Sequence, residues 1–309
     1  CNKVKKVKKE DIKMSFNIAN EFRCMLSRIS PKLNTKVTYY FKFKRFLNLN
    51  NPETLNEKIL WLKFNTYWKN PLIKQCADKY RVREYLEEKG YGDLLNPIIG
   101  VYDDVEKIDW DSLPQKFAIK FNVGCGKNII VKDKMEIDIP QIKKEIQGWF
   151  GLNYWQAYSE MQYKDVKPYV IIEKYLASSD GELPEDYKFF CMNGKCVTVM
   201  ICKDRVIGER ARYFFLDREW NLLPYTQEAL DSPNEYIPKP EKAFEAMQMA
   251  EKLAKEFPFV RVDFYIVNNQ IYFGELTFTP AAGMDVELML TPPGENKDVD
   301  TILGEKLVL

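Results

Sequence analysis

The chain has 309 residues, of which 46% are hydrophobic, so it can form a large hydrophobic core in one or two domains. It contains no histidine, which excludes Ser-His-Asp and Cys-His catalysis, histidine-ligated zinc and a histidine general base. No apolar run approaches the roughly 20 residues of a membrane span, and we find no signal-peptide hydrophobic region.

The net charge of +1 is unevenly distributed along the chain. Residues 1–50 contain 13 Lys/Arg and 3 Asp/Glu, whereas the remaining residues contain 33 Lys/Arg and 42 Asp/Glu. The opening run NKVKKVKKEDIK is typical of a solvated tail. The alternative interpretation is functional: residues 1–13 would contact a polyanion or the surface of a membrane. Because no nucleic-acid motif is present, we expect no nucleic-acid partner.

Seven cysteines lie at positions 1, 24, 76, 125, 191, 196 and 202, without a CxxC pair. An odd number without metal-ligand spacing is typical of reduced thiols in the cytoplasm. We therefore expect a cytoplasmic protein, with the inner membrane face as a peripheral location. A mature lipoprotein also begins with cysteine, but a chain that starts without Met is more often a piece of a longer protein.

The first half of the sequence predicts helices and then strands. The segment KVTYYFKFKRFLNL (36–49) predicts a helix that packs on the segment after it. Residues 51–68 predict another, with Pro52 in its first turn and Thr54 and Glu57 as a capping box. A third helix is expected over residues 71–89, ending at Gly90. Strands are expected at 94–102, 116–123 and 128–132.

The second half mixes the two kinds of element. Two helical stretches are expected between about 139 and 162, and an amphipathic helix over 240–257. Strands are expected at 169–176, 186–195 and 195–203, the last two joined by an Asn-Gly turn. Because helices and strands do not alternate regularly, the pattern predicts an α+β fold with mostly antiparallel sheets.

The segment RVDFYIVNNQIYFGELTF (261–278) predicts a hairpin with one acid in each arm, Asp263 and Glu275. A two-residue turn without a bulge places the acids on opposite faces, where they can simply face water. A three-residue loop, or one bulge, sets them directly opposite each other, where like charges repel unless a cation such as Mg²⁺ lies between them. Thr277 shares the face of Glu275.

Two further segments have the residues of a nucleotide site. In FAIKFNVGCGKNIIVK, Lys120 precedes a turn in which Gly124 and Gly126 allow backbone N–H groups to approach a phosphate. No Walker sequence is present, and the alternative is an ordinary hairpin turn. We interpret Cys125 as incidental. In YVIIEKYL, Glu173 can accept the amine of adenine, or it can simply end a strand.

Five segments occur in a recognisable order: DKYRVREYLEEKG (78–90), FAIK with its glycine loop (117–126), VIIEKYL (170–176), DYKFFCMNGK (186–195) and FVRVDFYIVNNQIYFGELTFTP (259–280). Together they resemble the ATP-grasp superfamily, and most closely its TupA-like branch, found in cell-surface polysaccharide synthesis. The resemblance covers about residues 50–309. It implies two α+β subdomains that hold a nucleotide between antiparallel sheets: a small lid at about 117–176, and a large subdomain formed by the remainder of 51–309. Residues 1–50 form a helical, basic and aromatic N-terminal segment.

The resemblance implies a nucleotide site. Lys79 and Lys120 would contact the phosphates, and the loop from Gly124 to Gly126 would cover the β- and γ-phosphates. Glu173 would take the adenine amine. The backbone of Lys174, Tyr175 and Leu176 would bind the adenine ring. Asp180 would bind the ribose, with Glu182 as the alternative ribose ligand.

The resemblance also implies a reacting centre. Asp263, Glu275 and Thr277 would ligate Mg²⁺, Arg261 would stabilise the oxyanion, and Lys188 would face the γ-phosphate or the acyl substrate. The chain departs from the superfamily in three ways: Thr277 replaces the usual Asn, Val123 replaces a His of this branch, and the upstream Rossmann-like domain is not visible.

The reaction implied is amide formation through an acyl phosphate, with ATP and Mg²⁺. The acyl substrate would be a uronic acid or another carboxylate of a glycan, and the second substrate a small amine. A kinase of the same fold acting on a sugar hydroxyl is one alternative. A non-catalytic glycan-binding or glycosyltransferase-associated module is another. In the last case aromatic side chains would either stack on sugars or form core: Trp149, Phe150, Tyr154, Trp155, Tyr158 and Tyr163.

Overall fold

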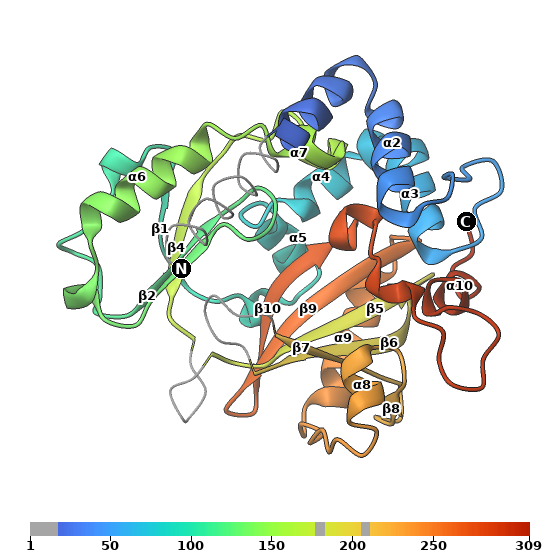
Figure 1. The fold of residues 1–309 in the computed structure, drawn as a ribbon. Helices are drawn as coiled ribbons and strands as arrows, with labels where there is room; N and C mark the ends of the chain where they lie inside the picture. The colour runs from blue at the N-terminus through green and yellow to red at the C-terminus, as the bar shows by residue number, and fades with distance from the viewer. Residues whose placement is uncertain (1–17, 177–182, 205–210) are drawn as a thin grey trace, which may run out of the picture.

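The computed structural model describes residues 18–176, 183–204 and 211–309 (Figure 1). Asp180, Glu182 and the basic run 1–13 therefore lie outside the described residues. Two antiparallel sheets lie side by side, and the N-terminal helices cover one end of the space between them (Figure 1). None of the helices within the described ranges has both the length and the apolar character that crossing a membrane requires.

The N-terminal segment is helical over residues 18–29 and again in α2, Pro31–Phe43. Ser30 caps α2, because its hydroxyl accepts the backbone N–H of Leu33 at 3.2 Å. The prediction of a helix over 36–49 is wrong beyond Phe43. Lys44 adopts the left-handed conformation (φ 56°) and ends the helix, so that the chain can bury Leu47 and Leu49.

Three short helices come next in the chain. In α3 (Leu55–Asn65) the capping box predicted from Thr54 and Glu57 is present, and Pro52 precedes the cap instead of lying in the first turn. The single helix expected over 71–89 is instead two, α4 (Pro71–Ala77) and α5 (Val82–Glu88). The chain is extended at Asp78 (φ −84°, ψ 116°), which separates them.

The small sheet has the order β1-β4-β2-β3, with every pair antiparallel. Its strands are β1 (Ile98–Tyr102), β2 (Phe117–Phe121), β3 (Asn128–Val131) and β4 (Val170–Lys174). Helix α6 (Ile139–Phe150) buries Ile142, Ile146 and Trp149 in the core of this sheet, and α7 (Tyr154–Tyr158) comes after it. All of these elements lie where the sequence predicts them.

The large sheet has the order β10-β9-β5-β6-β7-β8 and is also antiparallel throughout. Its strands are β5 (Asp186–Met192), β6 (Lys195–Lys203), β7 (Arg212–Leu216), β8 (Leu222–Leu223), β9 (Phe259–Val267) and β10 (Gln270–Thr277). The predicted amphipathic helix is α9 (Ala243–Ala254), and it packs its apolar face on this sheet (Figure 1). Two strands and two helices were not predicted: β7, β8, α8 (Gln227–Asp231) and α10 (Val299–Gly304).

Candidate functional site

One bulge decides the register of the hairpin β9–β10. Val267 pairs with Gln270 across a two-residue turn, whose residues Asn268 and Asn269 are both left-handed (φ 49° and 59°). The register shifts between Phe273 and Glu275, so Asp263 lies directly opposite Glu275. The bulge therefore produces the register that a shared ion would require.

Gly274 makes this bulge possible because no side chain fits there. A Cβ added at Gly274 would lie 2.9 Å from the backbone oxygen of Asp263, on the neighbouring strand. A contact this short forces the backbone to move. A glycine at the bulge thus allows the two acids to face one another.

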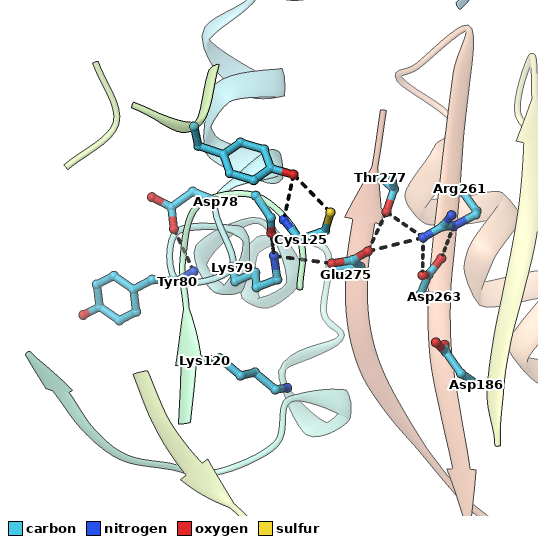
Figure 2. Close-up of polar contacts among 12 residues, drawn as sticks. Asp78, Lys79, Tyr80, Lys120, Cys125, Asp186, Arg261, Asp263, Glu275 and Thr277 are labelled. Atoms are coloured by element: carbon cyan, nitrogen blue, oxygen red, sulfur yellow. Dashed lines mark hydrogen bonds and ion pairs between the residues drawn. The ribbon is translucent and has the colours of Figure 1, made fainter. Parts of the chain in front are cut away.

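The guanidinium of Arg261 lies between the two facing acids (Figure 2). Its Nε and Nη2 donate to the two carboxylate oxygens of Asp263, both at 2.7 Å. Nη2 also lies 3.3 Å from Oε1 of Glu275 and 3.1 Å from Oγ1 of Thr277. The hydroxyl of Thr277 donates to the same oxygen of Glu275 at 2.8 Å. One cation therefore holds the three side chains that the resemblance implies as magnesium ligands.

Lys188 extends this cluster onto strand β5. Its amine lies 2.6 Å from Asp263 and 2.5 Å from Asp186. Oδ1 of Asp186 is buried and has no hydrogen-bond partner among the described residues. Asp186 was not predicted as a site residue, although it stands two residues before Lys188 and therefore on the same face of the strand.

Glu173 and Lys120 form the opposite wall of the site, on the small sheet. Their side chains form an ion pair at 2.7 Å, and Arg83, which was not predicted, lies 3.8 Å from the same carboxylate. Asn96 donates to Glu173 at 3.3 Å and to the backbone oxygen of Lys174 at 2.8 Å. Glu173 is the next-to-last residue of β4, and Tyr175 and Leu176 follow the strand.

Lys79 connects the two sheets. Its amine donates to the backbone oxygen of Gly124 in the glycine loop and lies 3.5 Å from Oε2 of Glu275 (Figure 2). Gly124 and Gly126 are both left-handed (φ 76° and 70°), as a tight anion-binding loop requires.

Asp78 and Asn122 fix the backbone on either side of Lys79. One carboxylate oxygen of Asp78 accepts the N–H groups of Tyr80 and Arg81, at 2.8 and 3.2 Å, in the turn that leads into α5. Its other oxygen accepts the amide of Asn122 at 3.0 Å, while the backbone oxygen of Asn122 accepts the N–H of Lys79 at 3.1 Å. The unpredicted break between α4 and α5 therefore positions the lysine.

The glycine loop also contacts α7, through Cys125. The hydroxyl of Tyr154 accepts the N–H of Cys125 at 3.1 Å and lies 3.0 Å from its sulfur. The ring of Tyr154 packs edge-on against Tyr163, with centroids 5.3 Å apart. Trp149 and Phe150 pack on Phe121, which favours the core interpretation for these two aromatic residues.

Charge compensation in the site is strongest at Glu275. Burial raises the pKa of this carboxyl, but the cations of Lys79, Arg261 and Lys188 outweigh burial and lower its pKa to about 2. Burial lowers the pKa of Lys188, and the carboxylates of Asp186 and Asp263 together raise it above its ordinary value. Both groups are therefore charged near neutral pH.

A cleft between the two sheets joins these groups. Its lining includes residues of both sheets and of the break before α5: Lys79, Lys120, Asn128, Glu173, Asp186, Lys188, Asp263, Tyr265, Phe273, Gly274 and Glu275. The cations fit the phosphates of a nucleotide. The hairpin offers hard oxygen donors, which fit Mg²⁺: two facing carboxylates and one hydroxyl. Within the described ranges, no group of three or more Asp, Glu or Cys side chains is arranged so that it could hold a metal ion.

Comparison with known proteins gives one family match. A family model described as TupA-like ATPgrasp matches residues 57–308, which is most of the chain. No curated protein matches the chain.

The solved structures with similarity to the chain include three ligases. D-alanine–D-alanine ligase from Bacillus anthracis, complexed with ATP, is 16% identical with a TM-score of 0.40, over 66% of this chain and 55% of the ligase. An L-amino acid ligase from Bacillus licheniformis is 11% identical with a TM-score of 0.44, over 76% and 48%. The ligase PsnB, complexed with its minimal precursor, Mg and ADP, is 13% identical with a TM-score of 0.42, over 81% and 64%. The chain thus spans about half to under two thirds of the length of these enzymes.

Proposed function

The chain belongs to the TupA-like ATP-grasp family, and we propose that it is an ATP- and magnesium-dependent ligase that joins a carboxylate to an amine. ATP-grasp proteins are typically ATP-dependent ligases. The observation that carries the proposal is the glycine bulge that sets Asp263 and Glu275 opposite each other, with Arg261 between them and Lys79 and Lys120 across the cleft.

The small-sheet wall and the break before α5 would bind the nucleotide. Lys120 and Lys79 supply cations for the phosphates, and the backbone N–H groups from Gly124 to Gly126 supply further donors. Lys79 contacts Gly124 and Glu275, so a phosphate would replace these contacts. Glu173 and the backbone of residues 174–176 would recognise adenine.

The hairpin would hold the metal through Asp263, Glu275 and Thr277. Bound there, Mg²⁺ would neutralise charge on the phosphoryl group. The low pKa of Glu275 keeps it ionised over the whole neutral range, as a ligand must be. Arg261 would exchange at least part of its contact with Glu275 for contact with substrate.

The reaction we propose has two steps. The substrate carboxylate attacks the γ-phosphoryl group and releases ADP; the amine then attacks the acyl carbon and phosphate leaves. Arg261 would stabilise the negative oxygen of the second step, and Lys188 the transferred phosphoryl group. Both side chains are held by Asp263; burial lowers the pKa of each, but the neighbouring carboxylates outweigh burial and keep both cationic. They act as electrostatic stabilisers, not as bases.

For the substrates, we propose a uronic acid or another carboxylate of a cell-surface polysaccharide, with a small amine. The TupA-like branch supports this choice. A cytoplasmic location belongs to the same proposal, and it is supported by the free thiols of the described cysteines: Cys24, Cys76, Cys125, Cys191, Cys196 and Cys202.

One observation favours a second candidate, a kinase acting on a sugar hydroxyl. The buried Asp186 has an oxygen without a partner among the described residues, and an acid in the cleft can serve a hydroxyl nucleophile as a base. The two candidates share every nucleotide-binding residue, so they must be separated by their products.

Hydroxylamine separates them, because it intercepts an acyl phosphate. With MgATP and glucuronic acid as the probe, a ligase yields a hydroxamate, with ADP and phosphate in equal amounts. Arg261→Ala should lower this turnover by on the order of 10²–10³ and leave ADP affinity nearly unchanged. A phosphorylated sugar without hydroxamate would favour the kinase, and glycosyl transfer without nucleotide would overturn both.

A further inference from the structure

The helix over residues 18–29 exposes its apolar face. Ile18, Phe22, Met25 and Ile29 are 60%, 48%, 49% and 71% exposed. Their spacing of four, three and four residues places them in one stripe along the helix. A helix on the surface of a water-soluble protein normally turns such a stripe toward the core. In this helix the apolar stripe faces outward instead.

The buried side of the same helix is polar. Ser27 is only 1% exposed, and its hydroxyl lies 2.5 Å from the backbone oxygen of Gln156 and 2.6 Å from the hydroxyl of Ser159. Asn34 donates to Ser27 at 2.8 Å and to Ser159 at 3.0 Å. These hydrogen bonds fix the helix on α7, so the orientation of the apolar stripe is specified by the packing.

Helix α2 also exposes apolar side chains. It buries Asn34, Thr35, Thr38, Tyr39 and Phe43 against the protein, whereas Leu33 and Phe41 on the other side are 44% and 65% exposed. Beyond its end, Phe46 is 84% exposed and stacks on the half-exposed Tyr40 with ring centroids 5.1 Å apart. We call the exposed apolar residues of 18–46 the apolar stripe: Ile18, Phe22, Met25, Ile29, Leu33, Tyr40, Phe41 and Phe46.

Basic residues flank the apolar stripe. Residues 18–46 contain seven Lys/Arg and a single acid, Glu21. Arg28, Lys32, Lys36 and Lys44 are exposed among the apolar residues. Hydrophobic and aromatic side chains with Lys and Arg beside them are the features of a segment that lies in the interface of a negatively charged bilayer.

We propose that the apolar stripe docks on an anionic lipid bilayer, with the two N-terminal helices lying in its interface. Charge complementarity selects this occupant: an apolar partner protein would leave the flanking lysines unpaired, whereas anionic headgroups pair with them while the acyl boundary takes the apolar side chains. The site lies in residues 18–46, and it does not depend on the basic run 1–13.

Docking would also orient the cleft. Lys42 of α2 donates to the backbone oxygen of Met284 at 3.2 Å, in the segment after β10. This hydrogen bond links α2 to the segment that follows β10, the strand that carries Glu275 and Thr277. If the proposed function holds, docking would therefore keep the cleft at a fixed orientation to the bilayer surface.

Vesicle flotation tests the proposal with the whole chain. We expect binding to phosphatidylcholine vesicles that contain about one quarter phosphatidylglycerol, and little binding to phosphatidylcholine alone. The double variant Phe22→Gln/Ile29→Gln should bind at least about tenfold more weakly, since it removes two apolar side chains from the stripe. The matched control Met135→Gln/Phe244→Gln changes two exposed apolar residues elsewhere, and it should bind like the unchanged chain.

Two further measurements separate the other occupants. Phe22→Trp should show fluorescence quenching by brominated acyl chains, whereas Phe244→Trp should not. Unchanged binding of the Phe22→Gln/Ile29→Gln variant, with no quenching at position 22, would mean attraction by charge alone and would overturn the proposal. A dimer in solution that this variant dissociates, without binding to vesicles, would assign the stripe to a second copy of the chain and overturn it as well.

Discussion

A folded protein usually buries apolar side chains and exposes charged ones, and the cleft and the apolar stripe each depart from this rule in a different way. The cleft buries charge: Asp263 is 2% exposed, with two cations in contact with it. The stripe exposes hydrocarbon, with Phe46 at 84%. Each departure is maintained by specific contacts, since the cleft has its ion pairs and the stripe has Ser27 and Asn34 on its reverse side.

This contrast indicates two different partners. Buried and compensated charge is pre-arranged for a charged ligand, because the protein groups are already desolvated and oriented. Exposed hydrocarbon is pre-arranged for an apolar phase. Changes in one region should therefore alter nucleotide chemistry and leave vesicle binding intact, and changes in the other should do the reverse.

The largest effect should come from Glu275→Gln. This change keeps the size of the side chain but removes the charge that faces Asp263, so metal-dependent turnover should fall by at least on the order of 10³. Binding to anionic vesicles should not change. ADP formation and vesicle flotation check this on one preparation. Normal turnover in this variant would remove Glu275 from the metal site.

Lys63 of α3 contacts the polar side of the N-terminal helices, opposite the apolar stripe, and its buried charge gives a second test of the comparison. This lysine is fully buried and donates to the backbone oxygen of Tyr158 at 2.6 Å and to Thr35 at 3.3 Å. Burial lowers its pKa from 10.5 to about 8, and the carboxylate of Glu160 only partly opposes this.

The unfolded chain therefore binds the proton more tightly than the folded one. The contribution of Lys63 to the free energy of unfolding should rise between about pH 8 and 10.5, by up to about 3 kcal/mol. Denaturant unfolding of the chain and of Lys63→Met over this range checks it, since the difference between the two isolates Lys63. A difference that does not vary with pH would contradict the assignment.

Gly274→Ala should break the cleft without adding or removing charge. The new methyl group would meet the backbone of Asp263 at 2.9 Å, so the strands must separate or the register must change, at a cost of about 1–3 kcal/mol. Gly148→Ala is the matched control: it lies within α6 with no atom near the added carbon, and it should stabilise the chain by about 1 kcal/mol. Thermal unfolding and ADP formation measure both. Equal behaviour of the two variants would mean that the bulge does not depend on glycine.

Asp78→Ala should have the smallest effect. It removes the acceptor of the Tyr80 and Arg81 N–H groups and the contact with Asn122, so stability should fall by about 1–2 kcal/mol. Because Lys79 loses its fixed backbone but keeps its charge, KM for ATP should rise while kcat changes little. Steady-state kinetics checks this. If kcat falls with unchanged KM, Asp78 does not act by positioning Lys79.

The sequence was sufficient for most elements but not for their exact arrangement in the site. Strand patterns and the capping box predicted the sheets and α3, since these signals are local. The register of the hairpin stayed open because it depends on whether Gly274 bulges, which the facing strand decides. The break at Asp78 was missed because Asn122, which is remote in sequence, supports it.

The apolar stripe shows another limit. Periodicity reveals that a helix has an apolar side, but it does not say which side faces the protein. Here Ser27 and Asn34 find hydrogen-bond partners on α7, which only the folded chain brings together with them. Arg83 was missed for a related reason, because its partner Glu173 is remote in sequence, whereas Asp186 could have been found from its position two residues before Lys188.

The central claim is that the facing acids of the hairpin, together with the lysines across the cleft, form a magnesium-dependent nucleotide site. Titration calorimetry with ADP, with and without Mg²⁺, tests it most directly, using Glu275→Gln as the comparison. We predict that the chain binds ADP with Mg²⁺ and much more weakly without it, and that the variant loses this dependence on the metal. Absence of heat with MgADP, together with no thermal stabilisation, would contradict the account.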